Sequence, residues 1–302
     1  MHKFLRAVGF SQYTEKKQVQ KLIRDIIIHA DERSYTTVGK KTLVAEFDRN
    51  FAEDIGIAVC GEFDEDDTYS FDYYLPYLRS DLVSTAEDIS IERHAAKESY
   101  AGICDDPKVG VSLIFYLQNM ISYLKLQGEG KIPAKGTSLN LSALSCQGTI
   151  MMPIQKTEWQ KKKIAKDAVQ RNRLIQAARG GDEEAMESLT LEDMDTYTSI
   201  SRKIQKADIF SFVDTYFMPY GVECDQYSVL GEITDMKLVT NGLTGEKVHI
   251  LTLCCNDLNL KVAINSIDLL GEPAVGRRLK GSEWSQGQVN FPEESEKSSR
   301  TA

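Results

Sequence analysis

The stretch VLGEITDMKLVTNGLTGEKVHILTLCCNDLNLKVAIN, residues 229–265, decides the fold of the C-terminal part of the chain. It holds three β-patterned runs, 229–238, 247–255 and 260–265, which are rich in apolar and β-branched residues. The turn-forming strings NGLTG and ND separate these runs. The pattern therefore predicts three strands joined by short turns.

Two more short β-patterned runs follow at 275–279 and 286–291, after a turn at Gly271 to Pro273. Five short strands within residues 222–291 are typical of a small antiparallel β-barrel, OB-like or SH3-like. A plain antiparallel sheet is the alternative. Residues 292–302, PEESEKSSRTA, have little apolar content to bury, so we expect a disordered tail there.

Residues 1–154 mix helical and strand patterns and are expected to form a separate α+β domain, which makes the whole chain α+β. Apolar residues at helical spacing predict an amphipathic helix over about 15–29. From Val109 onward the sequence fits both periods, and because this run of eighteen residues is long for a strand we expect a helix there, followed by a loop at Gly128, Gly130, Pro133 and Gly136. The expected strands are 55–61, 69–77, 89–91 and 100–104, with β-pattern again over 137–154.

Residues 155–221 are expected to form a helical connector between the two domains. A basic helix over 155–180 ends at Gly180 and Gly181, a short helix covers 182–189, and a third runs to about 207. We expect the Lys and Arg side chains of the basic helix to be exposed. Its apolar residues Trp159, Ile164 and Leu174 should turn toward protein.

The composition is that of an ordinary soluble globular protein. The chain has 302 residues, of which 42% are hydrophobic and 27% charged, and its net charge is −9. These values exclude a collagen-like, low-complexity or disordered chain and suggest two domains. No apolar run reaches roughly 18 residues, and the start MHKFLRAVGF lacks a secretion signal. We therefore expect a cytoplasmic protein without a membrane segment.

Cysteine, histidine and glycine usage points to no metal site and no cofactor. Six cysteines without a C-x-x-C pair fit neither a disulfide framework nor a zinc site, so reduced thiols are expected. The histidines have no metal-ligand spacing, and no Gly-rich phosphate loop is present. The acidic run Asp64 to Asp67 lacks the spacing of a calcium loop and is interpreted as a solvated hairpin tip.

One local grouping has the residue types of a catalytic site, namely His94, Cys104, Asp105 and Asp106. Cysteine catalysis needs a thiolate held beside a base, and no local signature supports that arrangement here. We interpret Cys104 as a buried thiol and predict no catalytic residue.

Charge is unevenly distributed along the chain. Residues 51–106 hold 15 acidic side chains against three basic ones, whereas residues 155–180 hold eight basic side chains against two acidic ones. The basic helix is interpreted as solvated or as paired with the acidic domain. A general nucleic-acid binder would more usually be basic as a whole.

The candidate nucleic-acid contact is the group Arg277, Arg278, Lys280 and Trp284. A basic strand beside an aromatic residue is how a small barrel holds a phosphate backbone and stacks a base. This hypothesis requires an exposed basic strip with Trp284 partly exposed on the same face. The alternative is a structural role, with an arginine paired to Glu272 or Glu283 and Trp284 in the core.

Several strings together carry a resemblance that spans nearly the whole chain up to Phe291. They are MHKFLRAVGFS, SYAGICDD, VSLIFYLQN, GDEEAMESLTLEDMD, FVDTYFMPYG, YSVLGEI, INSIDLLGEP and VGRRLKG. The chain resembles an uncharacterised family of proteins from Gram-positive anaerobes, catalogued as a domain of unknown function. The resemblance implies no activity, cofactor or site.

These observations favour a non-enzymatic accessory or regulatory protein that acts by binding a protein or a small ligand. A protein partner is expected, although the sequence does not identify it. Two alternatives remain. One is a nucleic-acid-associated protein that uses the barrel, and the other is a hydrolase that uses Cys104 or carboxylates such as Asp72, Asp105 and Asp106.

Overall fold

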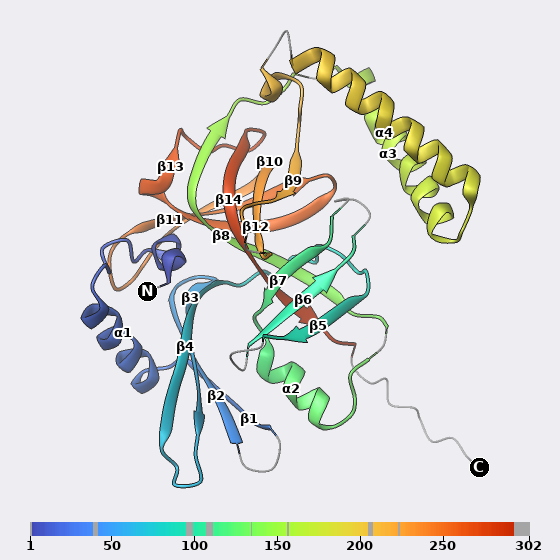
Figure 1. Cartoon of the computed structure of the whole chain (residues 1–302). Helices are drawn as coiled ribbons and strands as arrows, with labels where there is room; N and C mark the ends of the chain where they lie inside the picture. The colour runs from blue at the N-terminus through green and yellow to red at the C-terminus, as the bar shows by residue number, and fades with distance from the viewer. Residues whose placement is uncertain are drawn as a thin grey trace, which may run out of the picture.

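A closed five-stranded β-barrel lies at the centre of the computed structural model, which describes residues 2–38, 42–94, 99–106, 111–133, 135–155, 157–204, 208–222 and 224–292 (Figure 1). The barrel order is β8–β12–β11–β10–β14. Strand β8 pairs in parallel with β12 and antiparallel with β14, and these two pairings close the barrel. Its strands are β8 (Ser138–Met151), β10 (Gln226–Thr240), β11 (Lys247–Cys255), β12 (Leu258–Asn265) and β14 (Arg278–Asn290).

The predicted α+β class and the predicted barrel are confirmed, but residues 222–291 do not build the barrel alone. The fifth strand of the barrel is β8, which the sequence pattern assigned to the N-terminal domain. The two runs at 275–279 and 286–291 belong to one strand, β14. The polar and small residues KGSEWSQG interrupt its apolar pattern although the strand continues through them.

Strand β14 continues beyond the barrel and pairs in parallel with β7 (Leu113–Leu117). Two antiparallel strands extend this part of the sheet, β6 (Tyr100–Cys104) and β5 (Ile89–Arg93). The ring of Phe115 requires glycine on both neighbouring strands. A Cβ atom at Gly102 would lie 2.1 Å from its Cζ, and one at Gly287 would lie 2.6 Å from its Cδ2.

The helix predicted from Val109 onward is wrong in its first half, where the described residues include β7, and correct in its second, where they form α2 (Met120–Gly128). Hydrogen bonds to β14 fix the junction between β7 and α2. The backbone N–H of Gln118 donates to the carbonyl of Gly287, and the side chain of Asn119 donates to and accepts from the backbone of Val289. These long-range bonds favour a turn where the local pattern fits a continuous helix.

A second, antiparallel sheet packs against the outside of the barrel. Its order is β1–β2–β3–β4, with β1 (Glu32–Val38), β2 (Thr42–Ala52), β3 (Ile55–Phe63) and β4 (Tyr69–Leu78). The β3–β4 hairpin is confirmed, and the carboxylate of Asp64 caps its acidic turn by accepting from the N–H groups of Asp66 and Thr68. Strands β1 and β2 were not predicted.

Helix α1 (Lys16–Ile28) and the 3₁₀ helix η1 (Lys3–Val8) fill the space beside this second sheet. The predicted apolar face of α1 is confirmed, since Val19, Leu22, Ile23 and Ile26 are buried. These side chains share one core with β2, β3, β4 and the outer face of the barrel. The barrel interior and the sheet beneath α2 form the other core.

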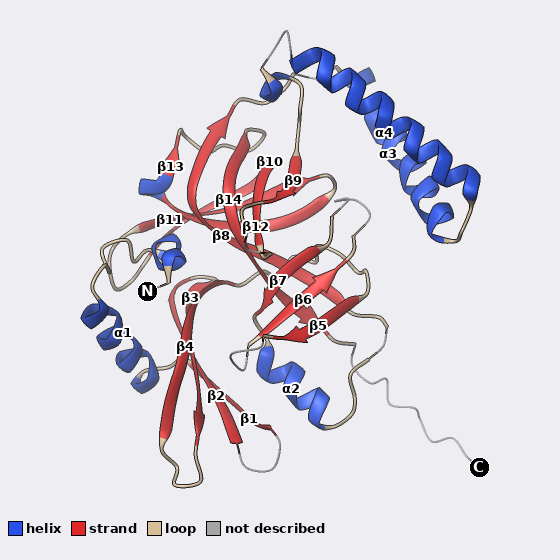
Figure 2. Cartoon of the chain, in the orientation of Figure 1, coloured by secondary structure: helices blue, strands red, loops and turns tan. Residues whose placement is uncertain are grey.

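The connector is a helical hairpin of α3 (Glu158–Arg179) and α4 (Glu183–Ile204), which projects away from the strands (Figures 1 and 2). We call it the arm. Helix α4 does not break near residue 189 as predicted. Thr190 lies within the helix and donates its hydroxyl to the carbonyl of Met186, so it does not cap a new helix.

The prediction that Trp159 turns toward protein is wrong. Its side chain is 71% exposed, and Lys163 lies over its ring at 5.7 Å. Leu174 is partly buried, and the side chain of Ile164 lies outside the described part of the structure. The described Lys and Arg side chains of α3 are exposed except Arg171, which is partly buried and forms ion pairs with Glu192 and Asp193 of α4.

The remaining elements are short. They are η2 (Ile209–Ser211), β9 (Tyr216–Pro219), η3 (Ser266–Asp268) and β13 (Leu269–Leu270). Within the described ranges, no helix has the length and apolar character needed to cross a membrane. Residues 293–302 of the expected tail lie outside the described residues.

Candidate functional site

Arg278, the centre of the predicted basic strip, is 4% exposed and turns away from solvent. Its Nε and Nη2 donate to the carbonyl of Met152 at 3.1 and 2.9 Å, and Nη2 also donates to Phe210. Its Nη1 donates to the carbonyls of Val213 and Asp214. All five N–H groups of the guanidinium are thus used by the backbone at the two ends of the arm.

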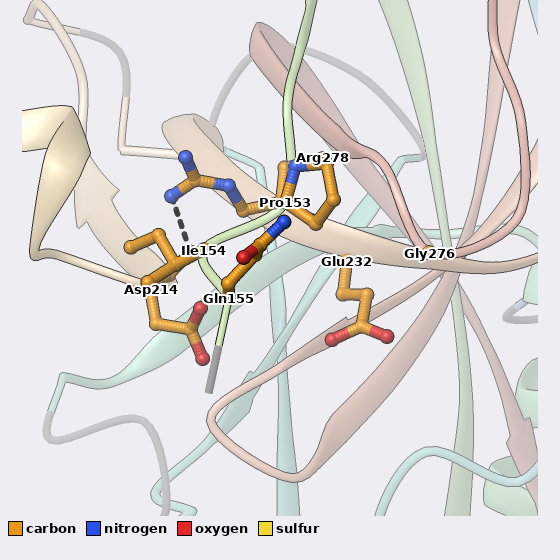
Figure 3. A pocket seen from close by; sticks show the side chains of 7 residues that line it. All are labelled: Pro153, Ile154, Gln155, Asp214, Glu232, Gly276 and Arg278. Atoms are coloured by element: carbon orange, nitrogen blue, oxygen red, sulfur yellow. Dashed lines mark hydrogen bonds between the residues drawn. The ribbon is translucent and has the colours of Figure 1, made fainter. Parts of the chain in front are cut away.

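A pocket of about 670 Å³ lies beside this arginine, and Figure 3 draws the side chains that line it. The carboxylates of Asp214 and Glu232 also line it, whereas the guanidinium of Arg278 is committed to carbonyl groups. A phosphate needs free donors, and two carboxylates would repel it. This pocket is therefore unsuited to a nucleic-acid backbone.

The other three predicted residues do not form an exposed strip either. Arg277 donates to the carbonyl of Glu272, and Lys280 lies over the ring of Phe210 at 4.3 Å. Trp284 is 6% exposed, and its Nε1 donates to Asp225 at 2.6 Å. Contacts within the chain therefore hold the residues chosen for nucleic-acid contact, and Trp284 lines a different cavity, described below.

The structure does not assemble a catalytic group from His94, Cys104 and Asp105. His94 pairs with Ser99, Asp105 accepts from Ser112, and no hydrogen bond joins the three to one another among the described residues. Burial, reinforced by the negative charge of Asp106, raises the pKa of the Cys104 thiol to about 12. A thiol that stays protonated is a poor nucleophile.

A cavity of 420 Å³, which we call the aromatic pocket, lies between β4 and the strands β7 and β14. Six of its lining residues carry aromatic or imidazole rings, and they come from four separate segments of the chain. The lining residues are His2, Phe71, Asp72, Tyr73, Tyr74, Leu75, Ser99, Tyr116 and Trp284.

The rings around the aromatic pocket are tilted against one another. The centroid of Trp284 lies 4.7 Å from that of His2 and 5.7 Å from that of Tyr116, with interplanar angles of 47° and 57°. Phe4 stacks on Trp284 at 5.4 Å with an angle of 20°, which supports the indole from another side. Tilted rings that surround one space present several π surfaces to the same occupant.

The polar groups of the aromatic pocket are few and distinct. Burial, with nearby positive charge, lowers the pKa of His2 to about 4, so its imidazole is neutral at pH 7. Its Nδ1 has no hydrogen-bond partner among the described residues. Asp72 is exposed and supplies the negative charge of the lining. No described Lys or Arg lines this pocket.

Sequence reasoning singled out Trp284 but gave it a different role, and it missed the other rings. Phe71 and Tyr73 alternate along one predicted strand, which is a local signal for one wall. His2 and Tyr116 lie far from this strand in the sequence, so their convergence on it has no local signature.

The comparisons with known proteins give a family and no function. A family model described as "Domain of unknown function, E. rectale Gene description (DUF3881)" matches residues 5–287. No curated protein and no solved structure matches the chain.

Proposed function

Because the chain belongs to DUF3881, a family defined without an activity, we propose from the geometry that it is a binding protein whose aromatic pocket holds a small organic cation. The class we propose is a methylated ammonium. The observation that carries the proposal is the convergence of six rings and one carboxylate on a single 420 Å³ cavity.

Aromatic rings attract cations through the negative charge on their faces, and quaternary ammonium groups are commonly bound in cages of such rings. Outside the pocket lining, Lys3 Nζ lies over the ring of Phe4 at 4.8 Å, and Phe4 in turn stacks on Trp284. Asp72 adds a charge of the right sign, and the acidic β3–β4 turn is part of the same hairpin. These features support a cationic ligand.

The same features disfavour the nucleic-acid alternative for this pocket. A nucleotide would stack on the rings, but its phosphate would need Lys or Arg donors, and the described lining contains none. The carboxylate of Asp72 would repel the phosphate. A cation satisfies both the rings and the carboxylate.

We propose that this binding takes place in the cytoplasm. All six cysteines are free in the structure. Cysteine-containing chains without disulfides are usual in reducing compartments.

A fluorescence titration tests the proposed function. The chain has two tryptophans, so in a Trp159→Phe background the indole fluorescence reports Trp284 alone. Choline should change this signal saturably. Its uncharged isostere 3,3-dimethyl-1-butanol should bind roughly tenfold more weakly, because it lacks the cation–π attraction. Equal affinity for both, or no saturable change with choline, would overturn the proposal.

In the same titration, Asp72→Asn should weaken choline binding about two- to fivefold, the size of an exposed charge interaction. Asp66→Asn is the matched control, since Asp66 lies in the β3–β4 turn and does not line the pocket. Its affinity should equal that of the parent protein. An equal loss in both variants would mean that only the general negative field acts, not a local contact.

A further inference from the structure

A second polar cavity, of 170 Å³, lies where β1 and β2 face the turn between β7 and α2. We call it the acidic pocket. Its walls are almost entirely polar, and they combine carboxylates from one sheet with amides from the other. The lining residues are Glu32, Ser34, Glu46, Asp48, Arg79, Gln118, Asn119, Ile121, Ser122 and Gln288.

Strand register brings the carboxylates of the acidic pocket together. Glu46 and Asp48 are two residues apart on β2 and so lie on the same face. Glu32 of β1 is paired directly with Asp48. Arg79 forms ion pairs with Asp48 and Glu32, so the described lining sets three carboxyl groups against one guanidinium.

Two of these carboxyl groups are buried and incompletely satisfied. Asp48 is 6% exposed, and although its Oδ2 meets Arg79, its Oδ1 has no hydrogen-bond partner among the described residues. Glu46 is 9% exposed, and within the described part of the chain its carboxyl accepts one weak hydrogen bond, from the Cys60 thiol 3.6 Å from Oε2. Buried acceptors without donors are rare in folded proteins and require an explanation.

The amide side chains that line the acidic pocket also supply a hydrogen-bond acceptor. The Nε2 of Gln118 donates to Leu78, Ser142 and Gln286, whereas its Oε1 has no donor among the described residues. The cavity therefore combines three acceptor oxygens that have no strong donor among the described residues, one each from Glu46, Asp48 and Gln118.

We propose that the acidic pocket binds the primary ammonium group of a small amine. An ammonium carries three N–H donors and one positive charge, which match the unsatisfied acceptors and the excess of carboxylates. A cavity of 170 Å³ suits a cation of only a few atoms. Within the described ranges, no group of three His, Cys, Asp or Glu side chains is arranged to hold a metal ion.

The raised pKa values of Glu46 and Asp48 predict how cation binding in the acidic pocket depends on pH. Burial, together with the negative charge of Asp48, raises the pKa of Glu46 to about 8. Burial raises the pKa of Asp48 to about 6, against the opposing effect of Arg79 and with further raising by Glu32 and Asp31. At pH 7 the pair thus retains a proton that a bound cation would displace, so binding should tighten between pH 6 and 9.

The acidic pocket and the aromatic pocket are separate, and their ligands differ in one property. Glu46 lines the first and Tyr73 lines the second, with the Cys60 thiol hydrogen-bonded to both side chains between them. A primary ammonium donates hydrogen bonds, whereas a quaternary ammonium has no N–H. Tetramethylammonium therefore reports the aromatic pocket alone, and the Asp48, Glu46 and Asp72 variants assign a methylammonium shift to one pocket or the other.

Thermal unfolding in methylammonium chloride tests the inference, with equimolar sodium chloride as the ionic-strength control. Saturating methylammonium should raise the Tm by about 2 °C or more. Asp48→Asn and Glu46→Gln should abolish that rise, while Asp72→Asn leaves it unchanged. The rise should also be larger at pH 8.5 than at pH 6.

Tetramethylammonium chloride separates this inference from the proposed function. Its Tm shift should persist in Asp48→Asn, which also shows that the variant is folded. Glu32→Gln, at an exposed position, is a further variant that leaves the core intact, and it should reduce the methylammonium shift. A methylammonium shift that is absent in the parent protein, or equal in all four variants, would overturn the inference whatever tetramethylammonium does.

Discussion

Replacing Glu283 by glutamine should flatten the pH dependence of stability by on the order of 4 kcal/mol between pH 5 and pH 8.5. Glu283 is 2% exposed, and neither of its carboxyl oxygens has a hydrogen-bond partner among the described residues. It is paired in register with Tyr227, so it shares the face of β14 that looks into the barrel. Burial raises the pKa of its carboxyl from 4.5 to about 8.

The direction in which stability changes with pH depends on whether the folded or the unfolded chain holds the proton of Glu283. Below pH 4.5 the folded and unfolded chains both carry a protonated Glu283, and its contribution to stability is complete. As the pH rises toward 8, the unfolded chain releases this proton while the folded chain retains it, so the free energy of unfolding falls. The Gln variant has no proton to release and should lose less stability over this window.

Urea unfolding at pH 5, 6.5, 8 and 9 measures this difference. Glu46 has a raised pKa in the same range, so Glu283→Gln should remove part of the slope, and a second variant with Glu46→Gln should remove more. The exposed Glu232→Gln is the matched control and should follow the parent protein. A parent protein with equal stability at pH 5 and pH 8 would contradict the prediction.

Arg278→Met should reduce the free energy of unfolding by on the order of 3 kcal/mol and loosen the arm. Methionine keeps the apolar stem but removes all five donors, leaving the carbonyls of Met152, Phe210, Val213 and Asp214 without them. Buried carbonyl groups that lose a charged donor are costly. Because these carbonyls lie where the arm joins the barrel, the local effect should be greatest there.

Urea unfolding and limited proteolysis together measure this effect. Arg277→Met is the matched control, since Arg277 is only partly buried and gives a single hydrogen bond to the backbone of Glu272. Cleavage between residues 152 and 214 should accelerate in the Arg278 variant and remain at the parent rate in the control. Equal stability of the two variants would show that Arg278 does not anchor the arm.

The parts of the fold that were predicted correctly are those decided by neighbouring residues. The strands within 229–265 alternate, and turn residues separate them, so each strand and its antiparallel partner were predictable. Strand β8 also had a β-pattern, but its place in the barrel depends on a parallel pairing with β12, and no turn links the two. The pattern of β8 contains nothing that selects this partner.

The site residues likewise divide into those that a local sequence pattern indicates and those that depend on contacts between residues far apart in the sequence. A basic, aromatic-containing strand was visible around residue 280, but the carbonyls that bury Arg278 come from both ends of the arm. The acidic pocket went unnoticed because β1 and β2 were not predicted, and their register is what sets Glu32 beside Asp48. Convergence of this kind is a property of the tertiary structure alone.

The closing of the barrel by β8 has a consequence for the order of events during synthesis. Ser138 at the start of β8 is hydrogen-bonded to Asn290, 152 residues further along the chain. A ribosome that adds about 5–20 residues per second needs roughly 8–30 s to cover this distance. For most of that interval β8, half of whose residues are apolar, has been synthesised without β12 and β14, the two strands that flank it in the barrel. Unpaired strand edges are prone to aggregation, and the barrel can close only after β14 has been synthesised.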